Sequence, residues 1–333
     1  MLSKEKVLTD TFARTINYLR VSITDQCNLR CMYCTPVDIQ KVTNIELLTY
    51  EEILRVVALA VSLGIKKVRL TGGEPLVRRG VLDFIRQLAA LPDLEEIRLT
   101  TNGVLLPDMI DDLYDAGIRK LNISLDSLQA EKFRQITSLD KFAKVWQGIE
   151  RAKEMKFEAV KINIVAMRGI NDDEIIDFAK LTLNNPYQIR FIEFMPIGPA
   201  VEAQKDKFIS SAEIIQRISS LGPLTPVERH KFHGPARILR LPKAIGSLGF
   251  ISPLTNHFCD TCNRLRLTSE GKLRACLLTD QESDLKHVLR NGGSNSEISQ
   301  LIIDTVKNKP KGHLLSKAQE TGSCHGRMSR IGG

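Results

Sequence analysis

The sequence predicts an α/β fold, namely an incomplete TIM-type (β/α)6 barrel followed by an irregular C-terminal extension. Short β-rich runs alternate with amphipathic helical runs at intervals of roughly 25 to 40 residues, as in consecutive βα units. Polar residues recur at every second position of these runs, which is unusual for buried parallel strands. Beyond Phe194 prolines and glycines interrupt the alternation.

The elements follow in order along the chain. We expect strands at Tyr18 to Thr24, Lys67 to Thr71, Glu96 to Thr100, Lys120 to Leu125, Ala159 to Val165 and Gln188 to Phe194. Helices fill the intervals. Thr49 and Glu52 form a capping box, an apolar stripe follows, and Gly64 supplies a left-handed stop. A second stripe runs from Phe142 through Trp146 to Ala152, and we expect both stripes to pack on the sheet.

The strands share a common phase. Aliphatic side chains occupy one face, and we expect them to meet the helices. The other face carries Arg20, Ser22, Arg69, Thr71, Thr100, Asn122, Ser124, Lys161, Asn163 and Arg190. A complete eight-stranded barrel fills its interior with side chains, so six strands with a polar lining predict an open barrel around a ligand. Its cationic residues suit a polyphosphate. The alternative is a flat doubly wound sheet with these charges at strand ends near solvent.

Pro196, Gly198 and Pro199 mark a boundary, so we divide the chain into residues 1–195, the barrel core, and 196–333, the extension. Overall composition is that of an ordinary globular protein, with 43% hydrophobic and 26% charged residues. No apolar run reaches the ~18 residues of a membrane span. The N-terminus MLSKEKVLTDTFART has no secretory pattern, so we expect a cytoplasmic protein.

The net charge of +8 attracts polyanions without specifying which. Aromatic residues make up only 5% of the chain, and no run of five like charges occurs. A platform for stacking single-stranded nucleic acid is therefore not evident, and we expect neither a nucleic-acid nor a membrane partner.

Six of the seven cysteines form two triads, one of Cys27, Cys31 and Cys34 and one of Cys259, Cys262 and Cys276. An odd cysteine total without a secretion signal favours metal or redox chemistry over disulfides. Three thiolates suit a four-iron cluster that keeps one iron open for another ligand. At the second triad, His257 provides an alternative Cys3His zinc site. Cys324 belongs to neither triad, and we expect a free thiol there.

The first triad, in DQCNLRCMYCTP, resembles that of the radical S-adenosylmethionine (SAM) enzymes, as do Tyr33 and the GGEP motif at Gly72 to Pro75. The second triad, in CDTCNRLRLTSEGKLRAC, and the C-terminal Gly332 and Gly333 narrow the resemblance to the GTP 3′,8-cyclases. It extends from about Arg14 to the C-terminus. Between Gly198 and Ile209 the tryptophan often seen in relatives is absent, so no residue is carried over from that stretch.

The resemblance implies two [4Fe-4S] clusters, one held by each triad, with SAM on the free iron of the first and the guanine edge on that of the second. Residues 1–195 would then be a radical SAM core, and residues 196–333 would carry the second cluster and the Gly-Gly tail. The SAM contacts implied are Tyr33, Gly73, Ser124 and Met195. The GTP contacts implied are Arg20, Arg69, Thr100, Lys161, Arg264, Leu265 through its backbone, and Arg266. Insertion of Gly332 and Gly333 into the barrel is also implied, as an aid to cyclisation.

Breaking an unactivated sugar C–H bond at neutral pH requires a cofactor radical. The resemblance implies that a 5′-deoxyadenosyl radical from SAM takes the 3′ hydrogen of GTP, that the ribose radical adds to C8, and that reduction gives 3′,8-cyclo-7,8-dihydro-GTP for molybdenum cofactor synthesis. Implied partners are an electron donor such as flavodoxin or ferredoxin, the downstream cyclic pyranopterin monophosphate synthase, and a second copy of the chain in a homodimer.

Two other functions remain open at this level. A radical SAM enzyme that modifies a peptide would use the second triad for an auxiliary cluster. A non-catalytic zinc or nucleic-acid-binding protein would account for the basic charge and the cysteines.

Overall fold

The computed structural model describes residues 7–34, 45–155, 157–195, 197, 206–228, 234–312 and 327–332. The six expected strands are β1 (Tyr18–Ser22), β2 (Lys67–Thr71), β3 (Glu96–Thr101), β4 (Lys120–Ser124), β5 (Ala159–Ala166) and β6 (Gln188–Glu193). All six are parallel and adjacent in chain order, which confirms the predicted succession of βα units.

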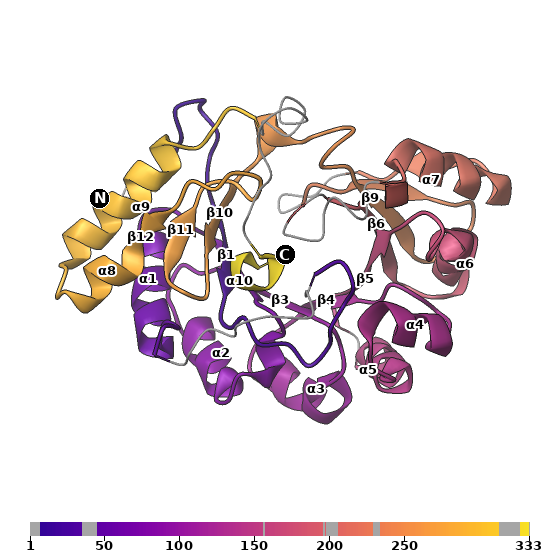
Figure 1. Cartoon of the computed structure of the whole chain (residues 1–333), viewed down its shortest axis with the longest axis horizontal. Coiled ribbons are helices and arrows are strands. Elements are labelled where there is room, and N and C mark those ends of the chain that lie inside the picture. The colour runs from indigo at the N-terminus through magenta and orange to yellow at the C-terminus, as the bar shows by residue number, and fades with distance from the viewer. Residues whose placement is uncertain are drawn as a thin grey trace.

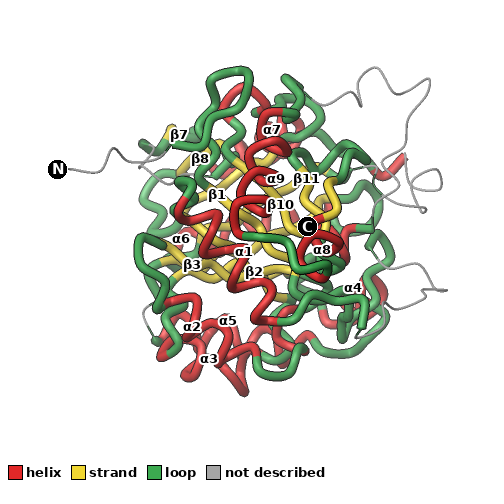
Figure 2. The backbone as a smooth tube through the Cα atoms, turned by 90° about the vertical axis from the view of Figure 1, so that its left-hand side faces the viewer, coloured by secondary structure: helices red, strands yellow, loops and turns green. Residues whose placement is uncertain are grey.

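Helices lie on the outside of this curved sheet (Figure 1). They are α1 (Tyr50–Ser62), α2 (Val81–Ala89), α3 (Leu106–Asp115), α4 (Ala130–Thr137), α5 (Phe142–Glu154) and α6 (Ile175–Asn184). Turned by 90°, the molecule shows its strands in the interior and α2, α3 and α5 on the periphery (Figure 2). None of the helices in the described part of the chain has the length and apolar character to cross a bilayer.

The start of α1 confirms the predicted capping box. The Glu52 amide donates to Thr49 Oγ1 at 3.2 Å, and the Thr49 amide donates to Glu52 Oε2 at 2.7 Å. Gly64 follows the helix with φ +116°, in the region that favours glycine. The buried stripe of α1 packs into the main hydrophobic core, as predicted.

The predicted strand phase is also correct. The aliphatic face, for example Leu19, Val68 and Leu121, is fully buried and belongs to the core beneath the helices. The polar face lines two pockets inside the curve of the sheet. An incomplete barrel around a ligand site therefore fits better than a flat sheet with its charges near solvent.

The C-terminal part is more regular than the sequence suggested. Strands β9 (Ser247–Ile251) and β10 (Arg264–Leu267) join the sheet in parallel, β9 beside β6 and β10 beside β1. Short antiparallel strands continue both edges: β7 (Thr225–Pro226) and β8 (Arg237–Arg240) beyond β9, and β11 (Lys272–Arg274) and β12 (Ser283–Asp284) beyond β10. The described sheet thus has eight neighbouring parallel strands.

The remaining helices are α7 (Ser211–Ile218), α8 (Leu285–Arg290), α9 (Asn295–Lys307) and α10 (Met328–Ile331), with short 3-10 turns at Pro75–Val77, Asp172–Glu174, Ser219–Leu221 and Cys259–Thr261. α10 lies inside the curve of the sheet, near the marked C-terminus (Figure 1). The Ser269 amide donates to Arg330 O at 3.2 Å, and Ile331 is buried. The tail is therefore part of the interior.

Candidate active site

Two adjoining pockets lie inside the curve of the sheet, with about 1180 and 1190 Å³ of space free of atoms, part of which is open to solvent. One pocket, here called the triad-1 pocket, is lined by Cys27, Cys31 and Cys34, and the other, the triad-2 pocket, by Cys259, Cys262 and Cys276. They share a wall of Thr100, Asn163, Ile192, Met195 and Met328. Molecules bound in the two pockets would meet at that wall.

The strand direction separates the two pockets. The triad-1 pocket is lined by residues at and beyond the carboxyl ends of the strands, such as Thr71, Ser124 and Val165. The triad-2 pocket is lined by residues nearer the amino ends, such as Tyr18, Arg69 and Arg190. Because these strands are parallel, the triad-1 pocket and the triad-2 pocket follow one another along the barrel axis.

The backbone of the GGEP motif packs closely against the backbone of residues 24–26, just before the first cysteine triad. The Gly73 amide donates to Thr24 O at 2.8 Å, and the Glu74 amide donates to Gln26 O at 2.7 Å. A Cβ on Gly73 would lie 2.3 Å from Gln26 O, so any side chain there would collide with backbone. The glycine therefore serves contact with the chain's own cysteine loop as well as lining the triad-1 pocket.

Glu74, the acidic residue of the GGEP motif, was given no role of its own from the sequence and is buried next to the cysteine loop. Its carboxylate accepts hydrogen bonds from Thr101 Oγ1 at 2.8 Å and from the amides of Asn102 at 2.6 Å and Leu76 at 3.0 Å. Burial nevertheless raises the pKa of Glu74 to about 7. Asn102 Nδ2 in turn lies 3.6 Å from Cys27 Sγ, so this network reaches the thiolate triad.

Tyr33 is held by Asp126, another residue missed from sequence. The Tyr33 hydroxyl donates to Asp126 Oδ2 at 2.6 Å, while the Val165 amide donates to Asp126 Oδ1 at 2.8 Å. Burial raises the pKa of Asp126 to about 6. Ser124 and Met195 line the same pocket, so the four residues assigned to SAM by resemblance, Tyr33, Gly73, Ser124 and Met195, come together.

Thiolate donors fit an iron–sulfur cluster in both pockets. Burial raises the pKa of Cys27 to about 11, so a bound metal would be needed to hold it as thiolate. No group of three His, Cys, Asp or Glu side chains in the described ranges is arranged around a single metal ion. The cysteines of one cluster bind different irons, so they need not converge in that way.

At the second triad, the Cys262 amide donates to Cys259 O at 3.1 Å in the turn before β10. His257 and Phe258 line the same pocket, and the Arg264 guanidinium lies 4.8 Å from the centre of the Phe258 ring. Burial opposes ionisation of the Cys262 thiol, but Lys309 and Arg264 hold its pKa below the ordinary value.

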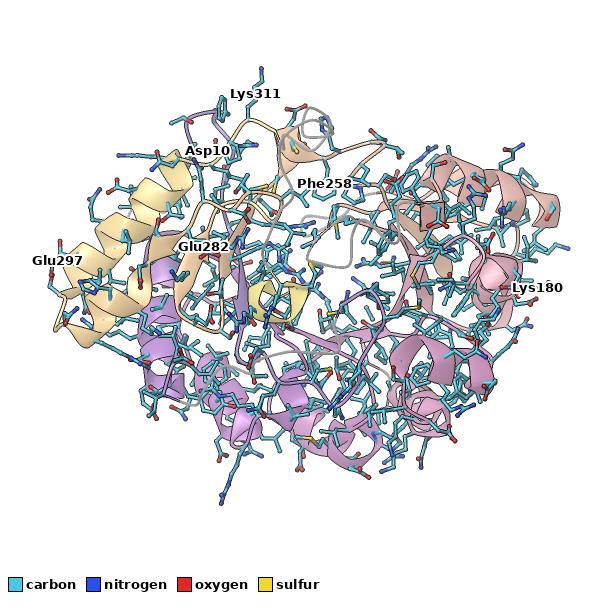
Figure 3. The ribbon with its side chains drawn as sticks, viewed as in Figure 1. Asp10, Lys180, Phe258, Glu282, Glu297 and Lys311 are labelled. Carbon is cyan, nitrogen blue, oxygen red and sulfur yellow. The ribbon has the colours of Figure 1, made fainter. Side chains whose placement is uncertain are left out.

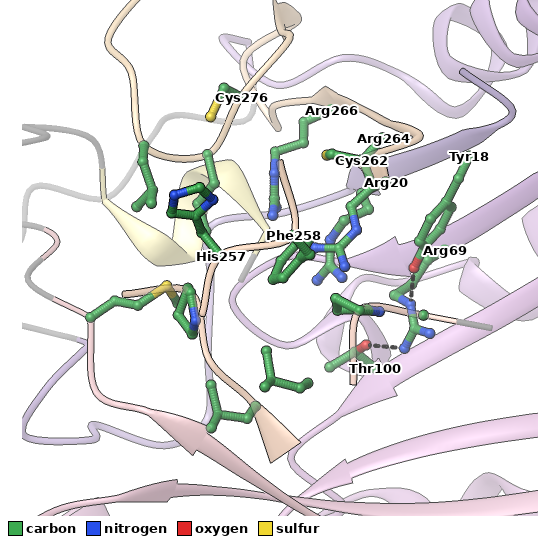
Figure 4. Close-up of a pocket in the computed structure, with 18 of the residues that line it drawn as sticks. Tyr18, Arg20, Arg69, Thr100, His257, Phe258, Cys262, Arg264, Arg266 and Cys276 are labelled. Carbon is green, nitrogen blue, oxygen red and sulfur yellow. Dashed lines mark hydrogen bonds between the residues drawn. The ribbon is translucent and has the colours of Figure 1, made fainter. Parts of the chain in front are cut away.

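Six arginines line the triad-2 pocket: Arg20, Arg69, Arg98, Arg190, Arg264 and Arg266. The β1–β10 register pairs Arg20 with Arg266, and the β1–β2 register pairs Arg20 with Arg69. Figure 4 shows the Arg69 guanidinium hydrogen-bonded to both Tyr18 and Thr100, with an Nη1–Oγ1 distance of 3.0 Å to Thr100. Three adjacent strands thereby direct cations into one chamber.

This cationic field alters the ionisation of nearby groups. Burial alone would raise the pKa of Tyr18, but Arg69, Arg20, Arg264 and Lys67 lower it to about 6. Burial, with the charges of Arg190, Arg98 and Arg69, lowers the pKa of Lys161 to about 5. Such a chamber is suited to a multiply charged anion.

The residues predicted for GTP do not all line the chamber. Arg20, Arg69, Thr100, Arg264 and Arg266 do. Lys161 is absent from the lining, although its charge interacts with Arg69, Arg98 and Arg190. Leu265 is 1% exposed and packs in the core, which leaves its backbone for any contact.

Sequence reasoning missed Arg98 and Tyr18 on this wall and did not assign a ligand role to Asn122 or Asn163. The oxygens Asn122 Oδ1 and Asn163 Oδ1 are buried and have no hydrogen-bond partner within the described structure. Both asparagines line the triad-2 pocket. A ligand that donates hydrogen bonds would satisfy them.

The C-terminal segment, residues 327–332, contacts residues of β1 and β10 inside the barrel. The Arg266 guanidinium donates to Gly332 O at 2.5 Å, and Ser22 Oγ lies 3.4 Å from Ser329 O. Arg330 pairs with Glu270 at 2.8 Å. Gly333, Cys324 and residues 198–205 lie outside the described residues.

Comparisons with known proteins agree with this arrangement. Residues 21–182 match the Radical SAM superfamily, and residues 187–315 match the Molybdenum Cofactor Synthesis C family. A protein of Thermodesulfovibrio yellowstonii named GTP 3′,8-cyclase is 51% identical over 92% of this chain and 95% of its own length. Proteins of the same name from Moorella thermoacetica (47% identical) and Pelotomaculum thermopropionicum (44% identical) each align over 98% of this chain and 100% of their length.

Among solved structures, Streptococcus suis SuiB bound to S-adenosylmethionine is similar, with a TM-score of 0.63 over 97% of this chain and 77% of that one. At 13% identity the likeness concerns the fold alone. The extent and identity of the sequence matches go further: the chain belongs to the GTP 3′,8-cyclase family of the radical SAM superfamily.

Proposed function

We propose that this protein converts GTP to (8S)-3′,8-cyclo-7,8-dihydroguanosine 5′-triphosphate in molybdenum cofactor biosynthesis. The observation that carries this proposal is the pair of adjoining pockets, each with its own thiolate triad, of which one is lined by arginines. A SAM-dependent radical source and a nucleotide triphosphate can thus occupy neighbouring spaces. We propose that the chain divides at residue 195 between these two tasks, with radical generation in residues 1–195 and second-cluster binding in residues 196–333.

In the triad-1 pocket, Cys27, Cys31 and Cys34 would hold a [4Fe-4S] cluster. That cluster, when bound, would supply the electron that splits SAM into methionine and the 5′-deoxyadenosyl radical. Tyr33, Gly73, Ser124 and Met195 would contact SAM, and the Asp126 carboxylate would fix the orientation of the Tyr33 ring.

In the triad-2 pocket, Cys259, Cys262 and Cys276 would hold the second [4Fe-4S] cluster. Arg20, Arg69, Arg264 and Arg266 would bind the triphosphate as forked donors, with Thr100 adding a hydroxyl, Leu265 its backbone and Lys161 a charge. The shared wall would then place the ribose of GTP beside SAM. The described tail, with Gly332 bonded to Arg266, would restrict how the substrate lies, and Gly333 would extend it.

The reaction needs reducing equivalents, for which we propose a donor such as flavodoxin or ferredoxin. The product would pass to cyclic pyranopterin monophosphate synthase. A homodimer is a further part of this proposal, and the molar mass in solution tests it.

Substitution of one cysteine in each triad tests the proposal. We expect Cys31→Ala to abolish formation of 5′-deoxyadenosine, because the radical-generating cluster loses a ligand. Cys262→Ala should keep the SAM-responsive cluster signal and lose conversion of GTP. Cys324→Ala, outside both triads, is the matched control and should behave as the wild type. Normal 5′-deoxyadenosine production by Cys31→Ala would contradict a radical SAM mechanism.

A further inference from the structure

Lys309 is a buried lysine next to the second cysteine triad. Lys309 is 3% exposed and follows the C-terminal end of α9, with its amide donating to Val306 O at 3.0 Å. A capping box of Ser294 and Glu297 begins that helix. Lysine is seldom buried without partners, because removing an ammonium group from water is costly. Its surroundings therefore indicate what it does.

The Lys309 ammonium joins two segments that carry cysteines. It donates to Arg264 O at 2.9 Å and to Ala275 O, and these carbonyls lie two residues after Cys262 and one residue before Cys276. The charge of the Lys309 ammonium also interacts with the Cys262 thiol and favours its thiolate form. An ammonium group has three donors, so one remains beside those that bind the two carbonyls.

A second cation supports the remaining cysteine. Arg14 Nη1 donates to Cys259 O at 2.7 Å, and Arg14 Nη2 donates to Pro310 O at 2.7 Å, directly after Lys309. Asp10 accepts from Arg14 Nε at 2.5 Å, which offsets the arginine charge. Asp10, Lys311 and Phe258 are labelled at the same end of the molecule in Figure 3. Of the two cations, Lys309 is the one whose charge lowers the pKa of the Cys262 thiol.

Resting on the second cluster proposed above, we propose that Lys309 is a positioning and charge-balancing residue of that site, which raises the reduction potential of the cluster. Three thiolates give the site negative charge, and reduction adds one more. A buried ammonium stabilises the reduced state more than the oxidised state, since the potential depends on net charge and on hydrogen bonds to sulfur. This role does not depend on titration of Lys309.

The test compares holoenzymes reconstituted under anaerobic conditions. Lys309→Met removes the charge and the donors, while Lys309→Gln keeps donors without charge and Lys309→Arg keeps charge. Lys307→Met, at an exposed position on α9, is the matched control. Redox titrations followed by EPR report each cluster, and the signal that does not respond to added SAM belongs to the second site.

We expect Lys309→Met and Lys309→Gln to shift the midpoint potential of the SAM-insensitive signal to more negative values. Lys307→Met should leave it unchanged, and Lys309→Arg should restore it toward the wild-type value. If Lys309→Met does not retain the second cluster, the midpoint potential of Lys309→Gln is the deciding measurement. If both variants lose the second cluster and Lys309→Arg retains it, the result supports the proposal, because the positive charge is then what the cluster requires.

A wild-type potential in Lys309→Met or Lys309→Gln would overturn the inference, as would loss of the second cluster in all three Lys309 variants, which would indicate packing rather than charge. These outcomes leave the proposed function intact. A wild-type protein with one cluster and no SAM-insensitive signal would instead overturn the second-cluster assignment itself.

Discussion

At the scale of single residues, the site is governed by an excess of positive charge in a confined space. Arginines from β1, β2, β3, β6 and β10 line one pocket, and Tyr18 supplies a hydroxyl that accepts from Arg69. Burial and mutual repulsion make these cations costly until an anion arrives. The triphosphate of GTP would provide the missing negative charge, so binding and ionisation should be coupled.

Lys161 should take up a proton when GTP binds. Its pKa in the free protein is lowered from 10.5 to about 5, and nearby phosphates would raise it. A group whose pKa rises on binding gains a proton, so affinity for GTP should weaken as the pH rises between the two pKa values. Calorimetry in buffers of different ionisation enthalpy measures this proton uptake. A pH of about 7.5 is suitable, because the terminal phosphate, with a pKa of roughly 6, is then already ionised.

Lys161→Met is the comparison for that measurement, since it removes the titrating group. The proton uptake should be smaller in Lys161→Met than in the wild type. Equal uptake in the two proteins would show that Lys161 does not change its ionisation when GTP binds.

At the scale of elements, the C-terminal segment and the strands β9 and β10 add to the barrel interior that the six βα units form. Gly332 has φ +78°, and a Cβ there would lie 2.1 Å from Thr71 Oγ1. Gly292 has nearly the same φ, +77°, but a Cβ there would have no neighbouring atom within 4 Å in the described structure. The two glycines therefore separate the effect of steric collision from that of backbone strain.

Gly332→Ala should displace the tail from the barrel and suppress cyclisation by roughly 10- to 100-fold, because small errors in orientation cost rate more than affinity. Binding of GTP and the content of both clusters should change little. Gly292→Ala should keep near-normal turnover although its φ is equally unfavourable for a residue with a side chain. Initial rates of GTP conversion measure both, and full turnover by Gly332→Ala would refute a role for the tail.

Prediction from sequence succeeded where the signal was local. The six strands, the capping box of α1 and the polar strand face follow from periodicity and capping residues. β9 and β10 were missed because their place in the sheet comes from parallel pairing with β6 and β1, which lie far away in the sequence. Gly249 also interrupts the apolar pattern of β9, where it lies against Arg190.

Site prediction shows the same limit. The cysteine triads are local patterns, so cluster chemistry could be inferred from their spacing, and the GGEP motif contributed through the family resemblance. Asp126 and Lys309 act through contacts with residues far along the chain, and no local pattern distinguishes them from ordinary buried or surface charges. Glu74 lies within the GGEP motif, but its partners Thr101 and Asn102 are distant in sequence, so the motif alone did not indicate what it binds. Lys161 differs from the other predicted GTP contacts, since its side chain is not part of the pocket lining and reaches the chamber through its charge.

At the scale of the whole molecule, the described residues form one sheet, with eight parallel strands and short antiparallel strands at both edges, and two stacked pockets. The first pocket lies at the carboxyl ends of the strands, and the second extends toward the amino ends, closed at one side by β10 and the second triad. Thr100, Asn163, Ile192, Met195 and Met328 form the only wall that both pockets share in the described structure. The central claim is that a radical formed in the first pocket reacts with a nucleotide held in the second.

Hydrogen transfer across that wall is the direct test. The protein, with both clusters reconstituted, would be incubated anaerobically with SAM, dithionite and GTP deuterated at C3′. Chromatography with mass spectrometry should show deuterium in 5′-deoxyadenosine together with formation of the 3′,8-cyclised nucleotide. Formation of 5′-deoxyadenosine without deuterium, with GTP recovered unchanged, would contradict the account.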